Sequence, residues 1–256
     1  ESAGIPASTL VSIANNAHVI TKNHKTEDSK DSRIGTTKRG NGPAYRDKYN
    51  RTGTRAKELE CFQGYLIDIY EELYSNPNAE ILFEGAQGFG LDIDHGDYPY
   101  VTSSHCTTAA ALLNGVPPQA IRKVWGIAKI YETYVGAKSF QPEDAVFDTI
   151  QQVGEEFGAT TGRKRQCNWT DIDTLLKAVR MNGVTDLVFN KMDVLREVGE
   201  WNLKAKISCF ISKMKAKLKV GSLLFSPTRP PYLMSTFPEI KIGFSSFRHY
   251  LVSDGK

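Results

Sequence analysis

The stretch ILFEGAQGFGLDIDHGDYPYVTSS, residues 81–104, is the part of the sequence that says most about the fold. It begins with a short apolar run at residues 81–83, which predicts a buried strand. The glycines that follow let backbone amides approach a ligand that a Cβ would keep away. The polar residues 92–104 then predict a binding loop at the carboxyl end of a strand, where α/β sheets hold ligands. Composition alone leaves a polar surface loop as the alternative.

Two further glycine-containing segments carry hydroxyl and cationic side chains. Residues 35–48 combine glycines with two threonines and four cations, and residues 156–165 combine two threonines with three cations. Backbone N–H groups, hydroxyls and two-pronged guanidinium groups suit a phosphate or a carboxylate. On composition alone, a flexible basic loop is an equally good interpretation of the first segment, and a basic surface turn is the alternative for the second.

A guanine-type motif follows the apolar run at residues 187–189. Asn190-Lys191-Met192-Asp193 has the order of residues that GTPases use at the end of a strand. The Asp193 carboxylate would accept hydrogen bonds from N1–H and the 2-amino group of guanine, and adenine would leave it unpaired. The stem of Lys191 would cover the base while its ammonium group stays solvated. A chance match of four residues is the alternative.

The composition is that of an ordinary globular chain. Of 256 residues, 40% are hydrophobic and 24% are charged, and a net charge of +3 suits an anionic substrate without demanding nucleic acid. The four cysteines are scattered without a Cys-x-x-Cys pair. This argues against a zinc site or a disulfide framework and fits a reducing cytoplasm. No apolar run nears the roughly 20 residues that span a bilayer.

Periodicity predicts the remaining elements. Helices are expected at residues 56–74, from Ala109, and after Thr170, where Thr170 and Asp173 match a capping box. Strands are expected at residues 10–13, 17–20 and 124–128, and a surface loop that buries little at residues 22–33. Residues 204–220 alternate apolar residues with lysines, which predicts two half-buried strands. A basic ribbon for nucleic acid is disfavoured there because no aromatic residues interleave to stack bases.

These segments resemble the adenylosuccinate synthetase family, which joins aspartate to IMP with hydrolysis of GTP. Residues 81–104 carry the resemblance, together with Gly-Asn-Gly-Pro at residues 40–43 and its following tyrosine, lysine and arginine, the nearly unbroken match at residues 158–165, and residues 190–193. It covers most of residues 8–195 and, more weakly, the tail. Asn41, Phe89 and Gly90 depart from the family's usual residues, so the packing of loop and pocket wall is expected to differ.

The resemblance also implies site residues. Lys48, the lysine of the family signature, is the catalytic candidate. The implied IMP-binding residues are Thr37, Arg51, Gln87, Thr102 and Arg163. The implied aspartate-binding residues are Thr160, Thr161, Gly162, Arg163 and Arg165. The implied GTP-binding residues are Arg165, Lys191, Met192, Asp193, Ser253, Asp254 and Gly255. Mg²⁺ is the implied cofactor and GTP a co-substrate, but the metal ligands are unknown.

For the architecture, the resemblance implies an α/β fold with a mostly parallel central sheet flanked by helices, similar to P-loop NTPases. Smaller antiparallel strands are expected near the C-terminus. Residues 1–256 are expected to form a single domain, with a divergent, strand-rich lobe at residues 198–247. The implied assembly is a cytoplasmic homodimer in which Arg51 reaches the partner's IMP phosphate, without nucleic acid or membrane partners.

The family's N-terminal phosphate loop, of the type Gly-Asp-Glu-Gly-Lys-Gly, does not occur in this sequence, and neither does Gly-x-x-x-x-Gly-Lys-[Ser/Thr]. In the family that loop holds the aspartate base. We therefore expect an N-terminal portion with the metal ligands to be missing, and residues 1–256 alone not to form adenylosuccinate. The alternatives are an enzyme of the same family that acts on another purine nucleotide, such as dGMP, and an inactive nucleotide-binding paralogue.

Overall fold

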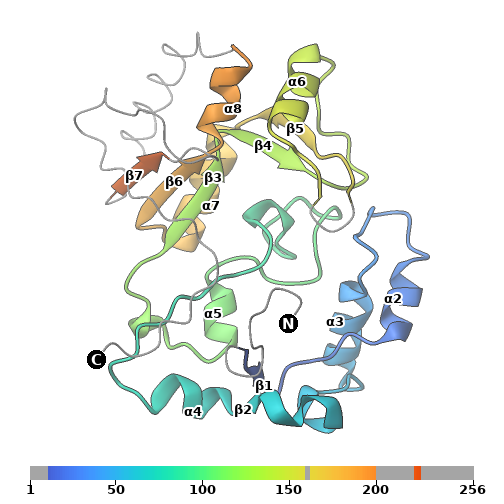
Figure 1. The fold of residues 1–256 in the computed structure, drawn as a ribbon, viewed down its shortest axis with the longest axis vertical. Coiled ribbons are helices and arrows are strands. Elements are labelled where there is room, and N and C mark those ends of the chain that lie inside the picture. Colours follow the sequence, from blue (N-terminus) through green and yellow to red (C-terminus); the bar gives the residue numbers. More distant parts are fainter. Residues whose placement is uncertain (1–10, 159–161, 200–221, 226–256) are drawn as a thin grey trace. The chain divides into compact units, whose positions relative to one another are not determined.

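The computed structural model describes residues 11–158, 162–199 and 222–225. It contains two compact units, and the chain passes from the first to the second between Ala120 and Ile121; Figure 1 labels their elements. None of the helices described is long and apolar enough to cross a membrane. The lysine-rich residues 204–220 and the predicted GTP-binding residues 253–255 lie outside the described residues. The single domain and the strand-rich lobe at residues 198–247 stay predictions.

A three-stranded parallel sheet is the centre of the second unit. Its strands are β3 (Trp125–Lys129), β6 (Asp186–Asn190) and β7 (Ser222–Phe225), in the order β3-β6-β7. Lys129 lies opposite Asn190, at the carboxyl ends of both strands. The sequence expectations of an apolar strand near residues 124–128 and a buried strand at residues 187–189 are confirmed. Parallel strands joined through helices make this unit α/β, as predicted.

An antiparallel pair accompanies the sheet. β4 (Tyr131–Tyr134) pairs with β5 (Gln166–Trp169), and the helix α6 (Ala145–Val153) lies between them in sequence. An antiparallel element is therefore present at residues 131–169, whereas the antiparallel strands were expected near the C-terminus, most of which lies outside the described residues. α7 (Ile172–Asn182) and α8 (Met192–Glu197) flank β6 in the chain.

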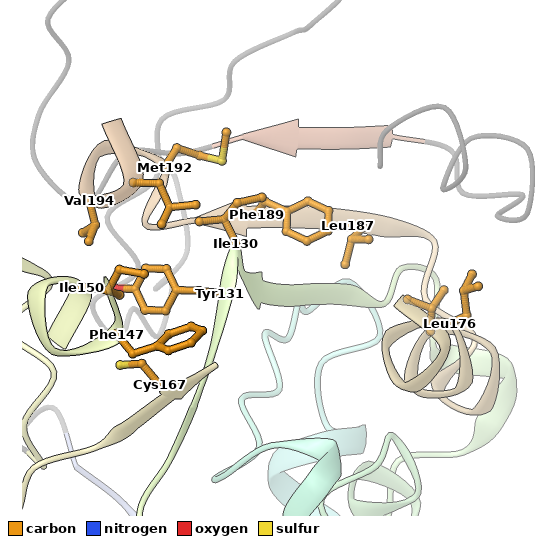
Figure 2. Packing of buried hydrophobic residues seen from close by; sticks show 12 residues of the cluster. Ile130, Tyr131, Phe147, Ile150, Cys167, Leu176, Leu187, Phe189, Met192 and Val194 are labelled. Atoms are coloured by element: carbon orange, nitrogen blue, oxygen red, sulfur yellow. The ribbon is translucent and has the colours of Figure 1, made fainter. Parts of the chain in front are cut away.

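The core of the second unit is formed by side chains from both sheets and all three helices. Figure 2 shows Tyr131 beside Phe147 and Ile150, and Leu176 of α7 near Leu187 of β6. The Phe147 and Trp169 rings meet edge to face with centroids 5.2 Å apart, a favoured geometry for aromatic pairs. The remaining fully packed members are Ile130, Cys167, Val179, Phe189, Met192, Val194 and Leu195. This core fixes the carboxyl end of β6, from which the guanine-type motif starts.

The first unit contains short elements joined by long loops. β1 (Ile13–Ala14) pairs in parallel with β2 (Leu66–Ile67). The helices are α2 (Lys22–Asp28), α3 (Asn41–Asn50), α4 (Ile69–Tyr74) and α5 (Ala109–Leu113), and short 3₁₀ turns lie at Ala56–Glu58, Glu60–Tyr65, Phe89–Leu91 and Pro118–Ala120. The expectation of a helix from Ala109 is confirmed.

The prediction of a surface loop at residues 22–33 is wrong, because residues 22–28 form the helix α2. Thr21 caps this helix: its side chain accepts from the backbone of His24, whose ring accepts from the Thr21 backbone. His24 and Asp28 are buried, and His24 Nε2 lies 3.0 Å from Asp47 Oδ2 on α3. A charged sequence thus buries its polar side chains because neighbouring elements supply hydrogen-bond partners.

Three other expectations are corrected. Residues 56–74 form two 3₁₀ turns, β2 and α4 rather than one helix, because Leu66 and Ile67 pair with β1 and Asp68 caps α4. Residues 81–83 form no strand and are exposed, since no neighbouring strand pairs with them among the described residues. The cap of α7 is Asp171, which accepts from the Asp173 backbone, while Thr170 donates to the Ile130 carbonyl.

Candidate functional site

Gln87 and Thr102, both expected to bind IMP, are in direct contact in the first unit. The Gln87 amide donates from Nε2 to Thr102 Oγ1 at 3.1 Å, and Ser104 Oγ donates to Gln87 Oε1 at 3.1 Å. Gln87 has a φ of 71°, a conformation uncommon outside glycine. The amide is exposed and presents both a donor and an acceptor, which suits the edge of a purine.

The buried carboxylate of Asp92 organises the loop that carries this pair. It accepts from the backbone N–H groups of Asp94 and His95 at 3.0 Å and of Cys106 at 2.6 Å. Burial raises the pKa of Asp92, but these backbone donors outweigh burial and leave the pKa below its ordinary value. Sequence reasoning included Asp92 only as one of the polar residues of a predicted binding loop. An aspartate followed two residues later by a turn is the local signal that would have indicated this role.

A second buried aspartate, Asp28, holds the loop that carries Thr37. Thr36 Oγ1 donates to Asp28 Oδ1 at 2.9 Å, and the Gly40 backbone donates to Asp28 Oδ2 at 2.8 Å. Gly40 has a φ of 86°, and a Cβ there would lie 2.9 Å from the His24 backbone, so only glycine fits. The loop between these anchors leaves Thr37, Lys38 and Arg39 exposed. Sequence reasoning did not assign Asp28 this role.

The two loops expected to bind IMP lie against each other. Thr37 lies four residues before the first residue of α3, and a Cβ at Gly42 in the first turn of that helix would lie 3.5 Å from Ser103 Oγ. The amino terminus of a helix favours an anion. Thr37, Thr102 and Gln87 thus belong to neighbouring segments, as the sequence resemblance implies.

Lys48 and Arg51 lie at the other end of α3. Arg51 is the C-terminal cap of the helix, with a φ of 64°, and is exposed. The Lys48 ammonium lies 5.7 and 5.8 Å from the ring centroids of Tyr45 and Tyr49, within the range of a cation–π contact. The catalytic role of Lys48 stays a prediction.

Alanine at position 28 is expected to lower the affinity for IMP roughly tenfold, because residues 36–40 lose two hydrogen bonds to a charged acceptor. Titration calorimetry with IMP measures the change. Asp31→Ala is the matched control, since Asp31 lies just beyond α2 and accepts from the Arg33 backbone instead. A folded Asp28→Ala variant with unchanged IMP affinity would show that this loop is not part of the nucleotide site.

The second unit places the guanine-type motif at the carboxyl end of β6. Asn190 is the last residue of the strand, Lys191 turns the chain with a φ of 65°, and α8 begins at Met192. Asp193 therefore stands in the first turn of α8. This strand-to-helix position is the one expected from sequence, and it agrees with ligand sites at the carboxyl ends of parallel strands.

The Lys191 ammonium group is not solvated, contrary to the sequence interpretation. It donates to the Gly154 carbonyl at 2.7 Å and lies 3.8 Å from Glu156 Oε1, and its side chain is only 17% exposed. The physical reason is that α6 and the loop after it bring an acceptor and a carboxylate to the end of β6. Sequence spacing alone could not reveal a contact across 37 residues.

The loop expected to bind aspartate is closed at its base by backbone hydrogen bonds. Gly158 donates to the Arg163 carbonyl and Gly162 to the Gly158 carbonyl, both at 2.8 Å. Gly162 has a φ of 64°, which favours glycine at this turn. Arg163 and Arg165 are half-buried beside this base. Thr160 and Thr161 lie outside the described residues.

Glu156 connects this loop to the guanine-type motif. Its carboxylate is 1% exposed and accepts from Lys129 Nζ at 2.8 and 2.9 Å, from Tyr131 Oη at 2.7 Å and from Arg165 Nη1 at 3.0 Å. Lys191 is the third cation beside it. Sequence reasoning missed Glu156, although its place immediately before the glycine-rich loop is a signal.

Among the described residues, only Asp92, Asp94 and His105 form a group whose side-chain atoms lie close enough to share a metal ion, within 4.8 Å of one another. Mg²⁺ prefers six oxygen ligands, most of them water or phosphate. Here both Asp92 oxygens already accept backbone hydrogen bonds and a histidine supplies the third ligand. This group does not fit Mg²⁺.

The comparison with known sequences identifies the family. The family model for adenylosuccinate synthetase matches residues 1–76 and 60–207. The adenylosuccinate synthetase of Nitratidesulfovibrio vulgaris strain DP4 is 39% identical over 243 residues, covering 73% of this chain and 57% of that protein. That of Chlorobium phaeobacteroides is 40% identical over 237 residues, covering 72% and 55%. The chain thus spans little more than half the length of these curated relatives.

Solved structures give the same result. The fully ligated adenylosuccinate synthetase of Plasmodium falciparum superposes with a TM-score of 0.71 at 30% identity, over 76% of this chain and 58% of that one. The succinoaminodeoxyadenylate synthetase of cyanophage S-2L, bound to dGMP and dATP, has a TM-score of 0.60 at 20% identity, over 77% and 65%; at that identity the likeness concerns the fold alone. By the extent of the family match, the chain belongs to the adenylosuccinate synthetase family.

Proposed function

We propose that this chain provides substrate sites of an adenylosuccinate synthetase, a carbon–nitrogen ligase that joins L-aspartate to IMP with hydrolysis of GTP to GDP and phosphate. One observation carries the proposal. Lys191 of the guanine-type motif and Arg165 of the aspartate-type loop converge on Glu156, at 3.8 and 3.0 Å, beside the carboxyl ends of β3 and β6. A guanine nucleotide and a carboxylate substrate would therefore bind next to each other.

The proposed roles follow the sites described above. Gln87 contacts the purine edge of IMP, and the threonines of the first unit contact its phosphate. The residues proposed for IMP are Thr37, Arg51, Gln87, Thr102 and Arg163; for aspartate, Thr160, Thr161, Gly162, Arg163 and Arg165; for GTP, Arg165, Lys191, Met192, Asp193, Ser253, Asp254 and Gly255. Lys48 is the catalytic candidate.

The chemistry of these residues is binding, orientation and charge stabilisation. Phosphoryl transfer depends mainly on positioning and on cationic and backbone donors, and the arginines supply two-pronged hydrogen bonds to carboxylate and phosphate. Mg²⁺, when bound with GTP, would neutralise phosphate charge. We further propose a homodimer through Arg51 and a cytoplasmic location, which the free thiols of Cys61, Cys106 and Cys167 support.

The purified native protein is expected to form adenylosuccinate from IMP, aspartate and GTP, and not with ATP in place of GTP. The reaction is followed by the absorbance change of the purine ring and by phosphate release. Parallel assays with dGMP in place of IMP distinguish the alternative that the cyanophage protein suggests. Preference for dGMP would identify another nucleotide specificity within the family, and tight IMP binding without turnover would indicate an inactive paralogue.

A further inference from the structure

Glu156 carries a charge arrangement that the proposed roles do not use. A single carboxylate, 1% exposed, faces the three cations Lys129, Arg165 and Lys191. Burying a carboxylate is costly unless cations and hydrogen bonds compensate it. Burial raises the pKa of Glu156, but the contacts with Lys129, Tyr131 and Lys191 outweigh burial and hold the pKa below its ordinary value. The group is therefore ionised at neutral pH.

We propose that Glu156 is a positioning residue that contacts Lys191 and Arg165 at the same time. One carboxylate then fixes the positions of both the guanine-binding and the aspartate-binding cation. The inference rests on the proposed function, because it takes the ligands of these two cations from it. Glu156 itself touches no reacting atom in this proposal. It acts through the two side chains that approach the substrates.

The surroundings of Glu156 hold its carboxylate in one place. Lys129, at the end of β3, and Tyr131, at the start of β4, both donate hydrogen bonds to it. Burial first, and then the hydrogen bond to Glu156, raise the pKa of Tyr131, so its hydroxyl stays protonated and donates. A Cβ at Gly154 would lie 2.5 Å from Tyr131 Oη, so glycine is required where the chain offers its carbonyl to Lys191. These contacts fix the carboxylate from two strands and from its own loop.

Both cations also contact the backbone of residues 154–156. The Arg165 backbone donates to the Glu156 carbonyl at 2.9 Å, and its guanidinium donates to the carboxylate. Lys191 is bound through Gly154, two residues before Glu156. A shift of residues 154–156 would therefore move both cations together. A purely stabilising ion pair would need only one of them.

The test is Glu156→Gln in the native protein. Glutamine keeps the shape but removes the charge, so the Michaelis constants for GTP and for aspartate are both expected to rise roughly tenfold, with that for IMP changed less than about twofold. Glu156→Asp keeps the charge on a shorter side chain, so its Michaelis constants for GTP and for aspartate are expected to lie between those of Glu156→Gln and those of the wild type. Glu132→Gln is the matched control, because Glu132 lies on β4 and accepts from the Asp171 backbone instead.

A second variant tests the coupling independently and decides the matter if Glu156→Gln does not fold. Lys191→Met is expected to raise the Michaelis constant for aspartate roughly threefold as well as that for GTP. A folded Glu156→Gln variant with both constants unchanged, or a Lys191→Met variant that affects GTP alone, would overturn the inference and leave the proposed function intact. A wild-type protein that uses neither GTP nor aspartate would overturn both.

Discussion

Removal of the Asp193 carboxylate by substitution with alanine is expected to weaken GTP binding by roughly 1.5–3 kcal/mol, or about 10- to 150-fold. The reason is the pair of hydrogen bonds that a carboxylate accepts from N1–H and the 2-amino group of guanine. IMP affinity is expected to stay within about twofold, because the proposed IMP contacts are elsewhere. Titration of each nucleotide against the purified variant gives both numbers.

Two companion variants sharpen this test. Glu197→Ala removes an exposed carboxylate from the same helix, α8, and is expected to leave GTP binding unchanged. Asp193→Asn replaces one acceptor oxygen by an amide donor, which complements the 2-carbonyl of xanthine. This variant is expected to prefer xanthosine triphosphate over GTP. Unchanged GTP affinity in Asp193→Ala would mean that the four-residue motif is a chance match.

Asparagine at position 92 is expected to destabilise the first unit by about 2–4 kcal/mol and to lower IMP affinity at least tenfold. The variant loses the charge that accepts three backbone hydrogen bonds in the loop between Gln87 and Cys106. Thermal unfolding by circular dichroism and IMP titration at a temperature where the variant is folded measure the two effects. Asp97→Asn in the same loop is the control for removing a carboxylate there.

The pH dependence of this effect has a definite sign. The folded-state pKa of Asp92 lies below the ordinary value of 3.8, so its stabilisation is complete above that value and is lost as the pH falls through the folded-state pKa. The difference in stability between the wild type and Asp92→Asn should therefore shrink in acid. A difference that is constant from pH 7 to about pH 2 would show that the charge is not what stabilises the loop.

Much of the candidate site could be predicted from sequence where the signal is local. Asn190 to Asp193 follow an apolar run, and in the structure they stand at the carboxyl end of β6, where the run and the motif together predicted them. The Gly183 stop of α7 was predictable for the same reason, because the φ of 60° favours glycine. The family resemblance implied that Gln87 and Thr102 both bind IMP, but it did not predict the hydrogen bond between them.

Other predictions were wrong because tertiary contacts override the local sequence pattern. The helical periodicity of residues 56–74 is interrupted where Leu66 and Ile67 pair with β1, more than 50 residues earlier. Residues 81–83 are apolar and yet exposed, since burial of a strand depends on a partner that its own sequence does not specify. The helix α2 was missed because its cap depends on reciprocal hydrogen bonds between Thr21 and His24.

The sequence by itself determined the α/β class, the family, and the choice of loops that we propose as binding sites. These depend on periodicity and on short motifs, in which residues close together in the sequence indicate the chemistry. Only the tertiary structure decided that Asp28 and Asp92 hold the two loops proposed to bind IMP and that Glu156 contacts Lys129, Arg165 and Lys191 together. A carboxylate that is removed from water is stable only with hydrogen-bond donors around it. These donors come from segments distant in the sequence, so no local pattern predicts which residues they are.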